Sequence, residues 1–280
     1  MPKAIDVHIH PPPPQGSAGN AAMRQYFRST VPHTTHEEMA AYYEEQDLLG
    51  VLLTIDNRSV SGSPPPASND YMAELQRLYP GRFISFGSVD PWLGAAAVNE
   101  AERCVKELGL RGFKFHASSQ RFFANDQRFY PLWEKISALG VPALFHSGMT
   151  GVGAGTPGGG GIKFEYCRPI PYMDDISADF PELTIIMAHP AFPWVPEQLA
   201  MLVHKPNVFM DLSGWSPKYF DPLLVQYANT IAKNKVMFGS DYQMISPERW
   251  LNDFEGAPFG DDVRPLILLE NAKRVLKLDL

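Results

Sequence analysis

The sequence is poor in cysteine and in long apolar runs. Its 280 residues include two cysteines, Cys104 and Cys167, and no Cys-x-x-Cys pair, which excludes a zinc site built from thiolates. One disulfide between them would not hold a chain of this length together, so we expect a reducing, cytoplasmic location. No apolar run reaches the roughly 18 residues that span a bilayer, and we expect no signal peptide before the polar Asp6.

The sequence also lacks an excess of basic residues. Lys and Arg total 24 against 31 Asp and Glu, which gives a net charge of −7. A general nucleic-acid-binding protein needs a basic face, so we expect no nucleic-acid partner and, without a spanning run, no membrane partner. The remaining composition is ordinary for a globular protein, with 45% hydrophobic residues. No shift in composition marks a boundary, so we expect a single domain over residues 1–280.

Eight short apolar runs recur along the chain, with helical or loop-like segments between them. Continuous apolar runs of this length are typical of parallel strands that are buried on both faces. The predicted strands are Ala4–His10, Gly50–Asp56, Arg82–Asp90, Leu110–His116, Val141–His146, Leu183–His189, Asn207–Asp211 and Lys235–Asp241. This alternation predicts an α/β protein with a single (β/α)8 TIM barrel, and an open doubly wound sheet is the alternative.

Helical signals fill several of the intervals between these runs. Apolar residues recur at helical spacing over Ala97–Leu108 and over Phe220–Ile231. Thr35 is followed three residues later by Glu38, which fits a capping box at the start of another helix.

Two segments interrupt the alternation and predict insertions after strands 1 and 5. The first runs from Pro11 to about His33, and the second from Gly148 to Gly161 has glycine at eight of its fourteen positions. Both would border the site at the carboxyl ends of the barrel strands. The second lacks the Gly-Lys-Ser/Thr ending of a phosphate-binding loop. A mobile gate is therefore favoured, and a solvent loop without a role stays open.

Histidine or aspartate ends each of the eight predicted strands. His8 and His10 alternate at the end of the first strand, so both imidazoles point to one face. His146 and His189 end the fifth and sixth strands, and Asp241 ends the eighth. The carboxyl ends of barrel strands converge on one cup. Imidazole and carboxylate are ligands for Zn²⁺ and similar ions.

We therefore expect His8, His10, His146 and Asp241 to hold one divalent metal that keeps an open water position. Zn²⁺ is the favoured ion, and Mn²⁺ is the alternative.

These motifs also resemble a known family. Asp6-Val7-His8-Ile9-His10, Phe145-His146, Ala188-His189-Pro190 and Gly239-Ser240-Asp241 occur in this order. Together they resemble the amidohydrolase superfamily, and in particular the amidohydrolase 2 branch, which includes aminocarboxymuconate semialdehyde decarboxylase and related aromatic-acid decarboxylases. The resemblance implies a divalent metal on the four ligands above, His189 as the catalytic acid/base, and pairing as a homodimer.

Several further residues are candidates for binding a carboxylated substrate. Arg168 offers a bidentate guanidinium, and a surface salt bridge is its alternative role. Lys114 and His116 lie two residues apart on the fourth predicted strand, so both can face inward. We interpret Lys114 as a substrate-anion or structural lysine, and His116 as a substrate group, a residue behind the ligands or a core residue. Phe192 and Trp194 would form an aromatic wall or simply pack in the fold.

Two reactions fit the expected site. A decarboxylase would protonate carbon through His189 as carbon dioxide leaves. A hydrolase would use water activated at the metal, with Asp241 or His189 taking the proton. We expect a metal-dependent carbon–carbon lyase or hydrolase acting on a small carboxylated cyclic or aromatic substrate. A metal-independent lactonase-type hydrolase and a non-catalytic ligand-binding barrel stay open as alternatives.

Overall fold

The computed structural model describes residues 1–14, 25, 28 and 35–280. Each of the eight predicted strands is present and is shorter than its predicted run. The strands are β1 (Ala4–Ile9), β2 (Leu48–Leu52), β3 (Phe83–Ser85), β4 (Phe113–Phe115), β5 (Ala143–His146), β6 (Ile185–Ala188), β7 (Val208–Asp211) and β8 (Val236–Met237).

The strands close into a barrel. β1 to β3 form one parallel sheet and β4 to β8 another, each in sequence order. A parallel bridge between Gly87 and Phe113 joins the segment after β3 to β4, and a second bridge between Ile9 and Tyr242 joins the segment after β8 to β1. The predicted TIM barrel is confirmed, and the alternative of an open sheet is wrong because both seams are bonded.

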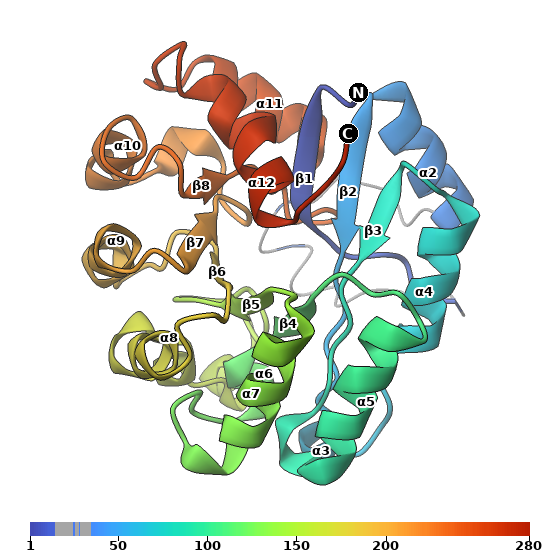
Figure 1. Ribbon diagram of the computed structural model, residues 1–280. Coiled ribbons are helices and arrows are strands. Elements are labelled where there is room, and N and C mark those ends of the chain that lie inside the picture. The colour runs from blue at the N-terminus through green and yellow to red at the C-terminus, as the bar shows by residue number, and fades with distance from the viewer. Residues whose placement is uncertain (15–24, 26–27, 29–34) are drawn as a thin grey trace.

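Helices surround the strands (Figure 1). They are α2 (His36–Glu45), α3 (Arg58–Ser61), α4 (Asn69–Leu78), α5 (Ala95–Lys106), α6 (Ala117–Gln120), α7 (Tyr130–Leu139), α8 (Asp174–Asp179), α9 (Val195–His204), α10 (Pro222–Ala228), α11 (Pro247–Glu255) and α12 (Asn271–Val275). The predicted capping box opens α2, and the two predicted helical spans correspond to α5 and α10. α10 ends before Ile231, which is 65% exposed. Asn229 is the C-terminal cap of this helix, and its side-chain amide donates to the Pro258 carbonyl.

Strand side chains alternate between two apolar layers, as burial on both faces requires. On β5, Ala143 and Phe145 pack in the layer that includes the helices, whereas Leu144 belongs to the barrel interior. Ala272 and Val275 of α12 pack against that interior layer. The barrel is therefore filled with side chains, which leaves the carboxyl ends of the strands for polar groups.

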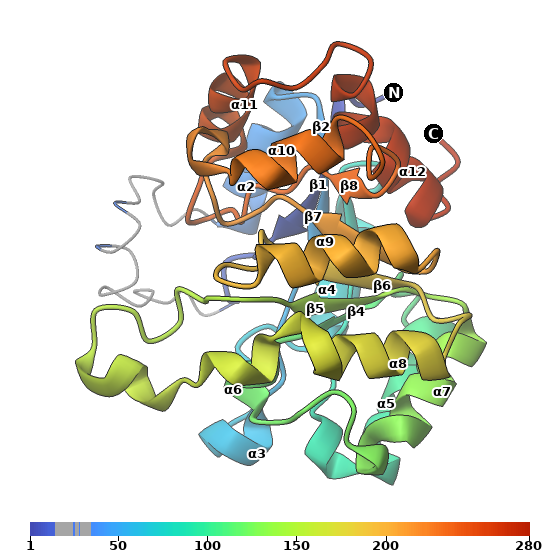
Figure 2. The ribbon, with the colours of Figure 1, turned by 90° about the vertical axis from the view of Figure 1, so that its left-hand side faces the viewer.

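The two predicted insertions differ in what the structure describes of them. Most of the segment from Pro11 to about His33 falls on residues 15–24, 26–27 and 29–34, which lie outside the described residues. The segment after β5 leaves the barrel at the end opposite to both termini (Figure 2). It begins at Gly148, where φ is +75° and a Cβ atom would lie 2.6 Å from the backbone of Ala191. Only glycine fits there, and a gating role for this segment stays a prediction.

Two other expectations concern the whole chain. Within the described ranges, no helix combines the length and the apolar character needed to cross a membrane. Cys104 and Cys167 are both buried, and neither forms a disulfide.

Candidate active site

A cavity of about 500 Å³ opens among the segments that follow the strands. Apolar side chains form much of its wall, and they include Ile55, Met149, Val152, Trp215, Met244 and Ile245. The predicted site residues that line it are His8, His10, Lys114, His116, His146, His189 and Asp241. The barrel therefore brings together polar groups from β1, β4, β5, β6 and the segment after β8, as expected for strand ends that converge.

Three of the predicted ligands direct acceptor atoms toward one another. His8 Nδ1 lies 3.1 Å from a carboxylate oxygen of Asp211, and His10 Nδ1 lies 3.2 Å from the carbonyl of Leu53. Because those oxygens only accept, both Nδ1 atoms carry the hydrogen and both Nε2 atoms keep a lone pair. The two Nε2 atoms lie 3.8 Å and 3.5 Å from the same oxygen of Asp241. Three facing acceptors fit a cation between them.

Candidate ligand atoms gather in two groups among the described residues. The first group is His8, His10 and Asp241, and the second is His8, His189 and Asp211. In each group the candidate ligand atoms lie within 4.8 Å of one another. In the second group, a hydrogen bond already joins His8 and Asp211, so the first group suits a metal better. His146 belongs to neither group, and its role as a ligand stays a prediction.

Burial controls the charges of this centre. Burial, with the nearby Lys114 charge, holds the pKa of His8 well below its usual range, so the imidazole is neutral as a ligand must be. Burial raises the pKa of Asp241 to about 7, although the Lys114 charge opposes this. Burial also lowers the pKa of Lys114 to about 8, and its Nζ lies 3.4 Å from His8 Nε2. A bound cation would favour the charged form of Asp241.

His189 and His146 form a pair beside this centre. His189 Nδ1 lies 2.9 Å from the carbonyl of Ser213, so Nδ1 carries the hydrogen and Nε2 keeps the lone pair. That Nε2 atom lies 3.1 Å from Nδ1 of His146. His146 Nε2 in turn lies 3.3 Å from the carbonyl of Met149. The His189 ring is therefore fixed through Nδ1, and its basic Nε2 faces His146.

The backbone is constrained at two of the site residues. His189 and Asp241 have φ values of 68° and 67°, which are uncommon for residues with a side chain and are concentrated at functional sites. Gly214 accommodates the His189 ring, since a Cβ atom at this position would lie 2.7 Å from His189 Nδ1. The buried Asp6 carboxylate accepts the Ser240 N–H at 2.8 Å, and this contact fixes the turn that carries Asp241.

The structure does not bring every predicted substrate residue to the cavity. Arg168 forms an ion pair with Glu197 at 2.6 Å, and its guanidinium carbon lies 5.8 Å from the ring centre of Trp194. Phe192 is 52% exposed, and its ring lies 6.0 Å from that of Trp215. Of these, only Trp215 lines the cavity. The salt bridge named as the alternative for Arg168 is therefore present.

His116 lines the cavity, but both of its ring nitrogens are engaged. Its Nδ1 accepts the Ser119 N–H at 3.2 Å, and its Nε2 lies 3.0 Å from the hydroxyl of Thr150. The ring stacks on His146 with centres 4.1 Å apart. His116 therefore contacts Ser119, Thr150 and His146 and has no free nitrogen for a ligand.

Sequence reasoning missed Thr150 and Arg249, which both line the cavity. Arg249 lies in the first turn of α11, and no described carboxylate forms an ion pair with its guanidinium. A signal was present, because Ser246 followed by Pro247 is a helix start that brings the next turn close behind Asp241. Asp211 on β7 accepts a hydrogen bond from His8 Nδ1 at 3.1 Å, which fixes the orientation of that ring.

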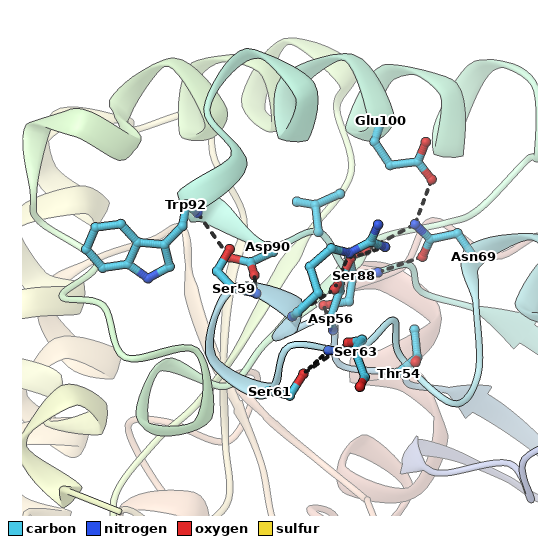
Figure 3. A network of polar contacts seen from close by, with 12 residues as sticks. Thr54, Asp56, Ser59, Ser61, Ser63, Asn69, Ser88, Asp90, Trp92 and Glu100 are labelled. Atoms are coloured by element: carbon cyan, nitrogen blue, oxygen red, sulfur yellow. Dashed lines mark hydrogen bonds and ion pairs between the residues drawn. The ribbon is translucent and has the colours of Figure 1, made fainter.

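A separate polar network holds the segments after β2 and β3 (Figure 3). Arg58 forms an ion pair with Asp56 at 2.7 Å. Asp90 accepts the N–H groups of Ser59 at 2.6 Å and Trp92 at 3.1 Å. These five residues are not among those lining the cavity. The charged groups of Asp56, Arg58 and Asp90 therefore stabilise the two loops.

A family model and known proteins match this chain. A family model described as "Amidohydrolase" matches residues 5–278. Gamma-resorcylate decarboxylase from Polaromonas sp. is 34% identical over 85 residues, which are 28% of this chain and 26% of that protein. The match thus spans about a quarter of that relative. 2-Keto-4-carboxy-3-hexenedioate hydratase from Sphingobium sp. is 26% identical over 247 residues, covering 77% of this chain and 68% of the hydratase.

A solved structure shares the fold. Dihydroxybenzoic acid decarboxylase from Polaromonas sp., with bound manganese and the inhibitor 2-nitroresorcinol, superposes with a TM-score of 0.69. The identity is 20%, and the match covers 99% of this chain and 98% of that one.

Proposed function

Because the chain belongs to the amidohydrolase family, we propose that it is a metal-dependent decarboxylase of small aromatic carboxylic acids. The observation that carries this proposal is the set of facing acceptor atoms on His8, His10 and Asp241. His189 stands beside this set with one basic nitrogen free of backbone contacts. The similarity to two decarboxylases supports the reaction, and the bound inhibitor of one supports an aromatic ring in the cavity.

The proposed cofactor is one divalent ion. His8 Nε2, His10 Nε2 and the Asp241 carboxylate would hold it, with His146 as the fourth ligand expected from the sequence. Such an ion polarises an oxygen of the substrate. Imidazole and carboxylate suit both Zn²⁺ and Mn²⁺. The manganese of the similar structure favours testing Mn²⁺ first.

His189 is the proposed catalytic acid. The bond between the ring carbon and the carboxylate carbon breaks, and its electron pair stays on the ring carbon. His189 Nε2 first takes up a proton from solvent and then delivers it to that carbon, while carbon dioxide leaves and Nε2 returns to its neutral form. The Ser213 carbonyl, 2.9 Å from Nδ1, keeps Nε2 directed away from the backbone. In a hydrolytic reaction, Asp241 would be the alternative base.

Two cations and one aromatic side chain complete the proposed substrate site. Lys114 lies beside the metal-binding atoms, 3.4 Å from His8, where it would pair with a carboxylate or phenolate oxygen. We assign Arg249 the role expected of Arg168, because it lines the cavity and forms no ion pair with a described carboxylate. Trp215 would pack against the substrate ring. The proposal includes a single domain over residues 1–280, a cytoplasmic location and a homodimer.

A second candidate is hydration of an unsaturated carboxylate. The similarity that favours it is to the hydratase, which matches much more of this chain than the decarboxylase sequence does. The same metal-binding residues and His189 would serve that reaction, since both reactions need a polarised substrate oxygen and a proton donor.

The test is turnover of 2,6-dihydroxybenzoate with Mn²⁺ or Zn²⁺, followed as release of carbon dioxide. Turnover that stops with a chelator and returns with either ion supports the proposal. Turnover unaffected by chelation contradicts metal dependence. Turnover of lactones alone, unaffected by chelation, would favour the lactonase-type alternative. Hydration of 2-keto-4-carboxy-3-hexenedioate without any release of carbon dioxide would replace the decarboxylase by the hydratase.

A further inference from the structure

The hydrogen on the His116 ring is assigned by its contacts. The backbone N–H of Ser119 donates to His116 Nδ1 at 3.2 Å, so this nitrogen carries the lone pair. A neutral imidazole with a lone pair on Nδ1 has its hydrogen on Nε2. That Nε2 atom lies 3.0 Å from the hydroxyl oxygen of Thr150. His116 is therefore the donor in this pair, and Thr150 is the acceptor.

The Thr150 hydroxyl accepts a second hydrogen bond. The backbone N–H of Val152 donates to the same oxygen at 3.1 Å. A hydroxyl has two lone pairs and one hydrogen, so both lone pairs are in use. No described residue accepts the remaining hydrogen. Thr150 is 6% exposed and lines the cavity, which is the space left for that hydrogen.

We infer that the Thr150 hydroxyl donates a hydrogen bond to a carboxylate oxygen of the substrate, and that His116 fixes its direction as a positioning residue. The inference rests on the proposed function, which supplies the carboxylate. Because both lone pairs are occupied, this hydroxyl can donate but cannot accept. It therefore favours a substrate that places an acceptor oxygen here, as a carboxylate does. A substrate that places a donor group here would be disfavoured. It also links the start of the glycine-rich segment to the bound substrate.

The matched variants are Thr150→Val, which keeps the shape and removes the hydroxyl, and Thr150→Ser, which keeps the hydroxyl. Titration calorimetry in Mn²⁺ measures binding of two probes, 2-nitroresorcinol and resorcinol. The nitro oxygens of the first stand where the carboxylate oxygens would be, and the second has no such group. We expect Thr150→Val to weaken 2-nitroresorcinol about tenfold, as expected for one lost hydrogen bond, and to leave resorcinol within about twofold. Thr150→Ser should bind both probes within about threefold of the wild type.

The kinetic expectation is a fall of about 10- to 100-fold in kcat/KM for 2,6-dihydroxybenzoate in Thr150→Val, because a bond to a charged oxygen is stronger. Equal weakening of both probes would mean a general structural defect and would overturn the inference. Unchanged 2-nitroresorcinol binding would overturn it as well. If the wild type binds neither probe, the proposed class of substrate is wrong and the inference falls with it.

A second measurement needs no ligand. Nitrogen NMR of the histidine rings distinguishes the nitrogen that carries hydrogen from the one that does not. We expect His116 to carry hydrogen on Nε2 in the wild type. Hydrogen on Nδ1 instead would make Thr150 the donor to His116, which leaves no hydrogen for the substrate and overturns the inference.

Discussion

Asp211→Asn is the substitution that tests how the predicted metal centre is supported. Asp211 is fully buried, and its carboxylate accepts from His8 Nδ1 at 3.1 Å, the Ser213 N–H at 2.9 Å and the His189 N–H at 3.2 Å. Asparagine keeps the shape but loses the charge and gains an NH2 donor. With that NH2 group facing His8, the hydrogen of the imidazole moves to Nε2, which is the atom that would bind the metal.

The expected magnitude follows from that single contact. A hydrogen bond to a charged group contributes about 1.5–3 kcal/mol. Substituting the partner of a metal-bound histidine typically weakens metal binding about 10- to 100-fold. We therefore expect Asp211→Asn to bind Mn²⁺ about 10- to 100-fold more weakly than the wild type.

The assay is competition for Mn²⁺ against a chelator of known affinity. Asp90→Asn is the matched control, because Asp90 is also fully buried and accepts two backbone N–H groups but contacts no predicted ligand. It should lower the free energy of unfolding and leave Mn²⁺ affinity within about threefold, since its site is independent. Wild-type affinity in Asp211→Asn, or an equal loss in both variants, would refute the reasoning.

Three further substitutions test other parts of the account. His189→Asn should reduce turnover about 10²- to 10⁴-fold, as loss of a catalytic acid does, and leave Mn²⁺ affinity nearly unchanged; turnover like the wild type would exclude His189 as the acid. Arg249→Gln should raise KM for an aromatic carboxylate about tenfold with little change in kcat. The control Arg77→Gln on α4 should change neither KM nor kcat. Equal effects of the two substitutions would exclude a specific role for Arg249. Gly214→Ala should lower both turnover and the free energy of unfolding, the latter by about 1–3 kcal/mol, because its Cβ atom would lie 2.7 Å from His189 Nδ1. Gly62→Ala, at a similar φ of +74° in open space, should cost about 1 kcal/mol in urea unfolding and spare turnover; an equal loss of turnover would contradict the packing argument.

The barrel could be predicted from sequence because each strand leaves a local signal. The run Leu183–His189 is apolar apart from Thr184 and its last residue, and the corresponding strand β6 ends at Ala188, just before His189. Parallel strands share one direction, so their terminal residues meet at one end. This is why His8, His10 and Asp241 could be expected together from positions far apart in the chain.

Residues on loops and helices were harder to predict, since no strand direction fixes where their side chains point. Arg168 is positioned by Glu197 on α9, a contact that depends on how the glycine-rich segment returns to the barrel. Thr150 and Arg249 line the cavity from the segment after β5 and from the start of α11. Their roles depend on which hydrogen-bond partners are left over after folding, and the sequence alone does not contain that count.

The central claim is that His8, His10 and Asp241 bind one divalent ion. A crystal soaked in Mn²⁺ and measured at the manganese absorption edge locates the ion directly. We expect one anomalous peak about 2.0–2.2 Å from His8 Nε2, His10 Nε2 and an Asp241 oxygen. A peak bound elsewhere, or no peak in a crystal whose His8 and Asp241 side chains are ordered, would contradict the account.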